Sequence, residues 1–295
     1  MISVVIPLYN KVGSIGSTVE SVLSQTYGDF ELIVVDDGSS DGSPEVVGLF
    51  ADSRIRLISK PNGGVCSARN AGIAAAKSEY VAFLDADDLW LPQFLEEIVR
   101  LMEDCPEAGI WGTSYYLQKD GQRTSAAKPL PAGYRGIVDN SGWTCAHIYC
   151  SSAVCCRKSA LVEAGLFDER MSYGEDLDMW WRIMLRHPAA YLNAECAVYR
   201  HDEDNRAMSR RIPLEKLHVR YLEKYSAERA ADPAFRHFID MECMWWLYPY
   251  FLSDPKNPEI RRILAQIDLS EYKKSFRLRF KLPHLYRVYT LCRRK

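Results

Sequence analysis

Residues 81–90 read VAFLDADDLW, a short apolar run that ends in three carboxylates within four positions. The apolar residues are typical of a buried strand. Asp85, Asp87 and Asp88 follow, and like charges this close resist ionisation unless a positive group lies between them. The stretch therefore predicts a strand whose end either binds a cation or forms an acidic turn in which Asp88 caps a helix over residues 91–105.

Three more apolar runs precede this strand along the chain. They cover residues 2–6, 31–35 and 55–58 and predict buried parallel strands as well. Between the four runs, three segments repeat their apolar residues at helical spacing, over residues 14–25, 43–51 and 65–76. This alternation predicts an α/β fold with a doubly wound, Rossmann-like, mainly parallel sheet. Ligands of such sheets bind beyond the carboxyl ends of the strands, so the loops that follow the strands are the candidate site.

The loops after the first three strands carry polar residues suited to a nucleotide. The first, residues 7–13, lacks the G-x-G-x-x-G and G-x-x-x-x-G-K-[ST] patterns, so phosphates must be held by other means. The second begins with Asp36 and Asp37, which either accept hydrogen bonds from a base or ribose or form a simple turn. The third brings backbone amides near Asn62 to a helix containing Arg69, a partner for a carboxylate or a phosphate.

The acidic turn is the fourth loop at this predicted sheet edge. Three carboxylates at a strand end suit a hard divalent cation, which binds through oxygen and shares substrate phosphates. Because the other three loops suit a nucleotide, the sequence favours the cation site over the acidic helix cap.

Three stretches together resemble the family 2 glycosyltransferases, which are inverting enzymes with the GT-A fold. They read VVIPLYNKVGSIGSTVESVLSQTYGDFELIVVDDGSSDGS, NGGVCSARNAGIAAAKSEYVAFLDADDLW and SAVCCRKSALVEAGLFDERMSYGEDLDMWWRI. Their order and spacing within the first 200 residues make the resemblance specific. It implies a nucleotide-sugar donor, usually UDP-linked, and Mn²⁺ or Mg²⁺ bound by DADD as the D-x-D motif.

The resemblance also implies roles for single residues. Asp87 is expected to be a direct metal ligand, with Asp85 near the ribose and the metal-bound waters. The donor nucleotide is expected to contact Pro7, Tyr9, Asp36, Asp37, Asn62, Arg69 and Asp85. His201 precedes a stretch, residues 202–209, that resembles the family's segment closing over the donor. His201 is therefore expected either to contact the metal or a phosphate or to lie in a solvated loop.

Residues 173–183, YGEDLDMWWRI, predict a helix that begins near Glu175 and Asp176. An acidic pair at this position is also an ordinary helix cap. In the family, the Asp of an E-D pair takes the proton of the acceptor hydroxyl, so the resemblance implies Asp176 as the catalytic base. The reaction would be a single displacement without a covalent sugar-enzyme intermediate.

The expected function is transfer of a hexose-type sugar from a UDP-sugar to a hydroxyl of a glycan or lipid-linked acceptor in cell-surface polysaccharide biosynthesis. A noncatalytic protein that binds nucleotide-sugars or glycans is one alternative. A sugar-phosphate nucleotidyltransferase is another, but the glycine-rich loop of those enzymes is missing after the first strand.

The resemblance fades after residue 212, which predicts a glycosyltransferase domain over residues 1–212 and a helical extension over residues 213–295. Residues 1–199 carry ten more acidic than basic side chains, whereas residues 200–295 carry eight more basic ones. The basic excess gathers in residues 273–295, which predict either peripheral membrane association or a solvated helix face. Nucleic acid is not an expected partner, because the remainder is acidic and contains no recognition module.

The sequence predicts a cytoplasmic protein, peripheral at the cytoplasmic face of the inner membrane if the basic tail binds lipid. No run approaches the 18 or so apolar residues of a membrane span, and the first residues lack a secretion signal. Nine cysteines without C-x-x-C spacing fit a reducing compartment. Cys145, Cys150, Cys155 and Cys156, with His147, are expected to be buried free thiols rather than a zinc site.

Overall fold

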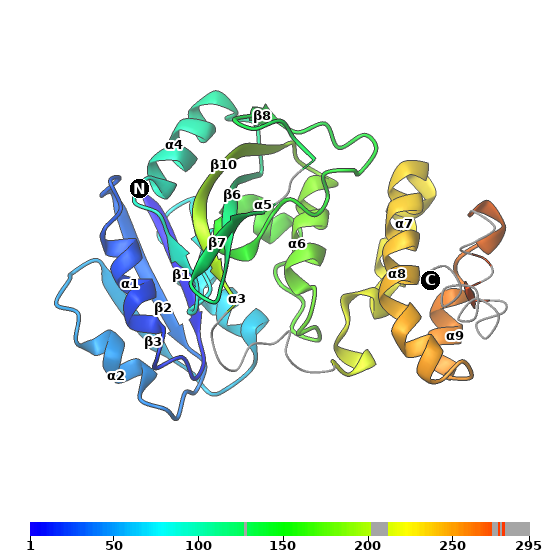
Figure 1. Cartoon of the computed structure of the whole chain (residues 1–295), viewed down its shortest axis with the longest axis horizontal. Helices are drawn as coiled ribbons and strands as arrows, with labels where there is room; N and C mark the ends of the chain where they lie inside the picture. The colour runs from blue at the N-terminus through cyan, green and yellow to red at the C-terminus, as the bar shows by residue number, and fades with distance from the viewer. Residues whose placement is uncertain (127–128, 202–211, 273–276, 278, 281–295) are drawn as a thin grey trace. The chain divides into compact units, whose positions relative to one another are not determined.

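The computed structural model describes residues 1–295 apart from 127–128, 202–211, 273–276, 278 and 281–295. The chain divides into two compact units, Met1–Ile212 and Pro213–Lys295. The division falls at residue 212, where the family resemblance ends in the sequence. Figure 1 shows strands and helices in the first unit and helices in the second.

One half of the sheet in the first unit contains four parallel strands in the order β3-β2-β1-β4. These are β1 (Ile2–Leu8), β2 (Phe30–Asp36), β3 (Ile55–Ser59) and β4 (Tyr80–Phe83). Each covers one of the apolar runs, which confirms the predicted α/β fold. β3 was predicted to be buried but is only partly so, with Leu57 37% exposed, because β3 lies at the sheet edge.

The other half of the sheet mixes strand directions. β9 (Val154–Arg157) is antiparallel to both neighbours, β4 and β6 (Ile110–Lys119), and places Val154 opposite Phe83. The remaining strands are β5 (Leu89–Trp90), β7 (Gln122–Ser125), β8 (Arg135–Ile137) and β10 (Ala189–Arg200). β10 runs parallel to β6 and antiparallel to β5 and β8.

Helices cover both faces of this sheet. One core cluster joins the even-numbered residues of β1 to α1 (Ile15–Leu23), α2 (Ser43–Gly48) and α4 (Phe94–Asp104). On the opposite face, Val5 and its register partner Phe83 meet α3 (Val65–Ala75) and α6 (Glu175–Met184). There the Phe83 and Trp180 rings lie 5.9 Å apart. The short helix α5 (Lys158–Glu163) packs against β9 and α6.

A glycine permits the close approach of α3 to the sheet. A Cβ atom on Gly72 would lie 2.3 Å from Val5 Cγ1, well inside van der Waals contact. Any larger residue would therefore move α3, which carries Arg69 one turn earlier.

The second unit begins with the 3₁₀ turns η3 (Leu214–Lys216) and η4 (His218–Tyr225). The helices α7 (Ser226–Ala231), α8 (Pro233–Ser253) and α9 (Pro258–Leu264) follow, and then the 3₁₀ turn η5 (Leu269–Glu271). None of the helices among the described residues is long and apolar enough to cross a membrane. Most of the basic tail predicted over residues 273–295 lies outside the described residues.

The cysteines of the predicted thiol cluster lie in β9 and in the segment that precedes it. Cys145, Cys155 and Cys156 are buried and Cys150 is half-buried, all as free cysteines. In the described part of the chain, no three His, Cys, Asp or Glu side chains converge in a way that could hold a metal ion.

Candidate active site

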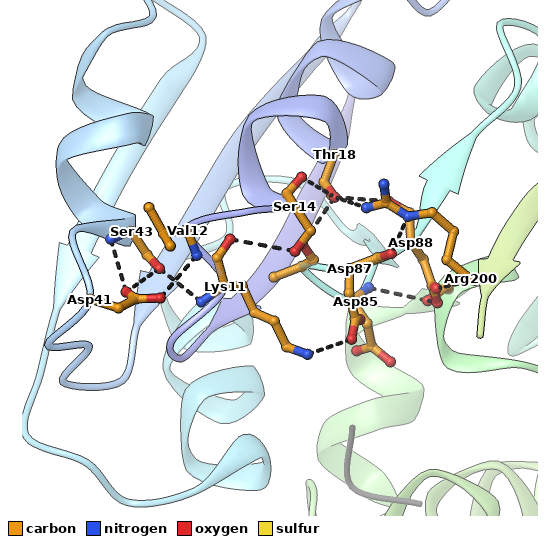
Figure 2. Close-up of polar contacts among 12 residues, drawn as sticks. Lys11, Val12, Ser14, Thr18, Asp41, Ser43, Asp85, Asp87, Asp88 and Arg200 are labelled. Carbon is orange, nitrogen blue, oxygen red and sulfur yellow. Dashed lines mark hydrogen bonds and ion pairs between the residues drawn. The ribbon is translucent and has the colours of Figure 1, made fainter. Parts of the chain in front are cut away.

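The acidic turn follows β4 directly and is closed by a hydrogen bond from Asp88 N to Asp85 O, 3.0 Å long. Its three carboxylates have different partners. Asp85 contacts Arg69, Asp87 contacts Lys11, and Asp88 contacts Ser152 together with the backbone of Arg200. Figure 2 shows the side chains of Asp87 and Lys11 meeting and Arg200 reaching this turn. The carboxylates therefore do not share one environment.

Asp88 is not the helix cap that the sequence offered as an alternative. α4 begins at Phe94, and Asp88 lies instead in the turn before β5, where it is only 1% exposed. Its carboxylate accepts hydrogen bonds from Ser152 Oγ and from Arg200 N at 2.9 Å. Burial, together with the neighbouring Asp87 and Asp85, raises the pKa of Asp88 well above its usual value. The buried Asp88 carboxylate thus ties the turn to Ser152 and to the backbone of Arg200.

Arg69 joins the acidic turn to α6. Its guanidinium donates to Asp85 Oδ1 at 2.8 Å and to Glu175 Oε1 at 2.9 Å, while its side chain is 3% exposed. The sequence allowed Arg69 to pair with a carboxylate or with a phosphate, and in the structure both of these partners are carboxylates. Burial still raises the pKa of Asp85 and of Glu175, although Arg69 opposes the shift.

Asp87 lies beside two cationic side chains. Lys11 Nζ is 2.7 Å from Asp87 Oδ2, and the guanidinium of Arg200 donates to the Asp87 carbonyl. Lys11 is fixed through its backbone, because its N–H donates to Ser43 Oγ at 2.8 Å and its carbonyl accepts from Ile15 N at 2.9 Å. Both ends of the Lys11–Asp87 pair are therefore anchored.

The loop after β2 is hydrogen-bonded to the loop after β3 through Asp37, which is 2% exposed. Its carboxylate accepts from Lys60 Nζ at 2.6 Å, Gly63 N at 2.9 Å and Gly64 N at 2.7 Å. Asn62 Nδ2 donates to the Asp37 carbonyl. Asp37 and Asn62, which were expected to contact the donor, therefore hold the second and third loops together.

The remaining residues expected to contact the nucleotide lie on β1 and β2 or directly after β1. Asp36 ends β2, and its Oδ1 accepts from Ser39 N at 3.0 Å. Pro7 pairs with Val35 in the sheet, one position before the register pair of Leu8 and Asp36. Tyr9 follows β1 and is 46% exposed, so its ring is open to a flat ligand.

Glu175 and Asp176 open α6, as the sequence predicted, after Gly174 with φ of +71°. Asp176 Oδ2 accepts from Ser151 Oγ and Oδ1 accepts from Leu177 N, both at 2.8 Å. Glu175 is buried and points to Arg69, whereas Asp176 is half-buried. Glu175 is thus committed to an ion pair with Arg69, whereas the Asp176 carboxylate is the more accessible of the two.

His201 follows β10 and is exposed. Its N–H donates to the Gln118 carbonyl at 2.7 Å, and its ring lies 5.3 Å from that of Tyr199. The segment expected to close over the donor, residues 202–209, lies outside the described residues. The role of His201 stays a prediction.

Four residues of this site escaped the sequence analysis: Lys11, Ser151, Ser152 and Arg200. Ser151 and Ser152 belong to the 3₁₀ turn η1 (Ser151–Ala153), immediately before β9. Because Val154 pairs with Phe83 in antiparallel register, Ser152 falls opposite Asp85. The only sequence signal for the two serines was their position just before the apolar run AVCC. The strand that pairs with this run could not be predicted.

The chain matches the family model described as glycosyl transferase family 2 over residues 3–163. An uncharacterized glycosyltransferase of Rickettsia bellii is 32% identical over 69% of this chain, but this chain spans only 29% of that protein. WfgD of Escherichia coli, named UDP-Glc:alpha-D-GlcNAc-diphosphoundecaprenol beta-1,3-glucosyltransferase, is 28% identical over 68% of this chain and 77% of its own length.

A solved structure has the same fold. A crystal structure of Staphylococcus aureus TarS in complex with UDP-GlcNAc superposes with a TM-score of 0.75 at 18% identity, covering 90% of this chain and 80% of that one. At this identity the likeness concerns the fold, which is the GT-A fold expected from the sequence. Because the family model covers more than half of the chain, the protein belongs to glycosyl transferase family 2.

Proposed function

We propose that the protein is an inverting glycosyltransferase that moves a hexose-type sugar from a UDP-sugar to a hydroxyl of a glycan or lipid-linked acceptor. The observation that carries the proposal is the Arg69 bridge, which ties Asp85 of the acidic turn to Glu175, the chain neighbour of Asp176. A donor-side carboxylate and a candidate base are thereby held at one edge of the sheet, as sugar transfer requires.

In this proposal Asp176 acts as the general base. It takes the proton of the acceptor hydroxyl while that oxygen bonds to the anomeric carbon. The bond from the anomeric carbon to the diphosphate oxygen breaks in the same step, and the nucleoside diphosphate leaves. Two hydrogen bonds orient the Asp176 carboxylate, and its remaining lone pairs can receive the proton.

The acidic turn fits a divalent cation, Mn²⁺ or Mg²⁺. Asp87 Oδ1 and Asp85 Oδ2 accept no hydrogen bond from the described residues. Such cations are commonly held by one or two carboxylates, with substrate phosphates and waters completing the shell. We therefore propose Asp87 and Asp85 as ligands; His201 is a third candidate. A bound cation would offset the charge of the leaving diphosphate.

The charge of the site also supports a cation. In the part of the chain that the structure describes, five carboxylates interact here with three cationic side chains: Asp85, Asp87, Asp88, Glu175 and Asp176 against Lys11, Arg69 and Arg200. The imbalance disfavours an anionic diphosphate unless a cation arrives with it or before it.

The likeness to WfgD supports a lipid-linked acceptor, because the name of WfgD specifies a diphosphoundecaprenol acceptor and a UDP-glucose donor. The proposal places the protein in cell-surface polysaccharide biosynthesis at the cytoplasmic face of the inner membrane. Peripheral membrane association through residues 273–295 is part of this proposal.

A donor screen tests the proposed function. UDP- and GDP-sugars are incubated with the full chain, with Mn²⁺, with Mg²⁺ or with a chelator, and nucleotide release is measured with and without lipid-linked saccharides. Metal-dependent release from one donor, increased by an acceptor, is the expected result. Binding of UDP without any release would favour the alternative of a noncatalytic nucleotide-sugar-binding protein.

Replacing Asp87 with Ala should abolish the metal-dependent part of UDP binding, because the proposal makes Asp87 a direct ligand of the cation. Titration calorimetry with UDP, with and without Mn²⁺, measures this part directly. Asp52→Ala is the matched control, since Asp52 pairs with Arg54 just before β3 and makes no contact with the acidic turn. Unchanged Mn²⁺-dependent affinity in Asp87→Ala would remove Asp87 as a ligand.

A further inference from the structure

The 3₁₀ turn η1 connects the two halves of the site through two adjacent serines. Ser151 Oγ donates to Asp176 Oδ2 at 2.8 Å. Ser152 Oγ donates to Asp88 Oδ2 and accepts from Asp85 N at 3.2 Å. Successive residues of a 3₁₀ helix project about 120° apart, so neighbours can serve different partners.

The turn is held by contacts that do not involve the serine hydroxyls. Ser152 O accepts from Trp90 Nε1 at 2.7 Å, and Ala153 N donates to Cys150 O at 2.9 Å. Ser151, Ser152 and Ala153 are all at most 4% exposed. The hydroxyls can therefore be changed while the backbone of the turn keeps its own support.

Burial makes each of the two serines selective for its partner. Because both hydroxyls belong to buried residues, each fixes the orientation of its carboxylate more firmly than a hydroxyl at the surface would. Ser151 has Asp176 as its carboxylate partner, and Ser152 has Asp88. The turn thus links the orientation of the proposed base to the shape of the acidic turn.

We propose that Ser151 and Ser152 are positioning residues with separate tasks: Ser151 orients the Asp176 carboxylate for proton transfer, and Ser152 holds the acidic turn in the shape that binds the donor diphosphate together with a cation. The inference rests on the proposed function, in which Asp176 is the base. Neither serine needs to touch the substrate in this role.

Threonine and valine provide a matched pair at each position, because they have nearly the same shape and differ in a hydroxyl against a methyl group. The variants are Ser151→Thr, Ser151→Val, Ser152→Thr and Ser152→Val in the full chain. Release of UDP is followed from UDP-glucose or UDP-N-acetylglucosamine, whichever the wild-type protein hydrolyses faster. Binding of UDP with Mn²⁺ is measured by calorimetry, and folding by thermal melting. Strain from the added methyl affects both members of a pair and cancels in their ratio.

At position 151, we expect kcat of the Thr variant to exceed that of the Val variant by about 10- to 100-fold, the size of one hydrogen bond to a charged group. The KM for the donor should differ by no more than about twofold between the Thr and Val variants, and so should the affinity for UDP. At position 152, the larger difference should appear in UDP affinity with Mn²⁺. Equal kcat for the two variants at 151, or a difference there in UDP affinity instead, would overturn the role of Ser151. A pair at 152 that differs in kcat alone would overturn the role of Ser152.

Asp176→Asn in the same assay separates this inference from the proposed function. If Asp176→Asn is inactive while Thr and Val at 151 are equally active, only the positioning role fails. If Asp176→Asn keeps full activity, the proposed base itself is wrong and the role of Ser151 falls with it.

Discussion

Asp176→Asn should lower kcat by about 10² or more and leave UDP binding nearly unchanged, because an amide cannot take a proton from the acceptor hydroxyl. The substitution preserves the shape of the side chain and an oxygen that can accept from Ser151 or from Leu177 N. Initial rates at saturating donor, together with UDP titration in Mn²⁺, distinguish loss of chemistry from loss of binding.

Asp52→Asn is the control for this experiment. Asp52 precedes β3 at the amino end of that strand and pairs with Arg54, on the side of the sheet away from the candidate site. It undergoes the same chemical change and should keep wild-type kcat. Wild-type turnover in Asp176→Asn would exclude Asp176 as the base, whatever the control does.

Arg69→Met should lower the free energy of unfolding by about 3–5 kcal/mol at neutral pH, the usual cost of breaking a buried ion pair by removing one partner. Asp85 and Glu175 would both lose the guanidinium that bridges them. Methionine preserves much of the length and the apolar contact with the Phe167 ring, which lies 5.3 Å from the guanidinium carbon. The loss would therefore come mainly from charge.

Lower pH should reduce this loss. Burial already raises the folded-state pKa of Asp85 and of Glu175, and removing Arg69 should raise both further. When folding raises the pKa of a carboxyl group, the group costs no stability below its unfolded pKa of about 4, because it is protonated in both states. As the pH rises from there through the folded-state pKa, the cost of ionising the buried group grows. The difference between Arg69→Met and wild type should thus be larger at pH 7.5 than at pH 5, as measured by urea unfolding.

Arg100→Met is the matched control for Arg69→Met. Arg100 is 54% exposed at its side chain and pairs with Glu96 and Glu97 on α4. Exposed pairs of this kind contribute about 0–1 kcal/mol, so the control should change little at either pH. An equal loss for Arg69→Met at pH 5 and pH 7.5 would mean that uncompensated buried carboxylates are not its cause.

The first four strands and the helices between them could be predicted from the sequence to within about three residues at each end. Each is a local pattern: a buried parallel strand needs a continuous apolar run, and a surface helix needs an apolar stripe. The family and its GT-A fold could likewise be inferred, because three long stretches carry the resemblance in order. The E-D pair at the start of α6 was also predicted, since helix starts have local signals.

The contacts that organise the site were decided by the tertiary structure. β9 enters the sheet antiparallel between β4 and β6, and only this register brings Ser152 opposite Asp85. Likewise, β10 delivers Arg200 to the acidic turn from more than a hundred residues away. Periodicity reports which side of a strand is buried and not which strand lies beside it. The sequence by itself therefore determined the carboxylates of the site, and the packing of strands, helices and loops determined which groups hold each of them.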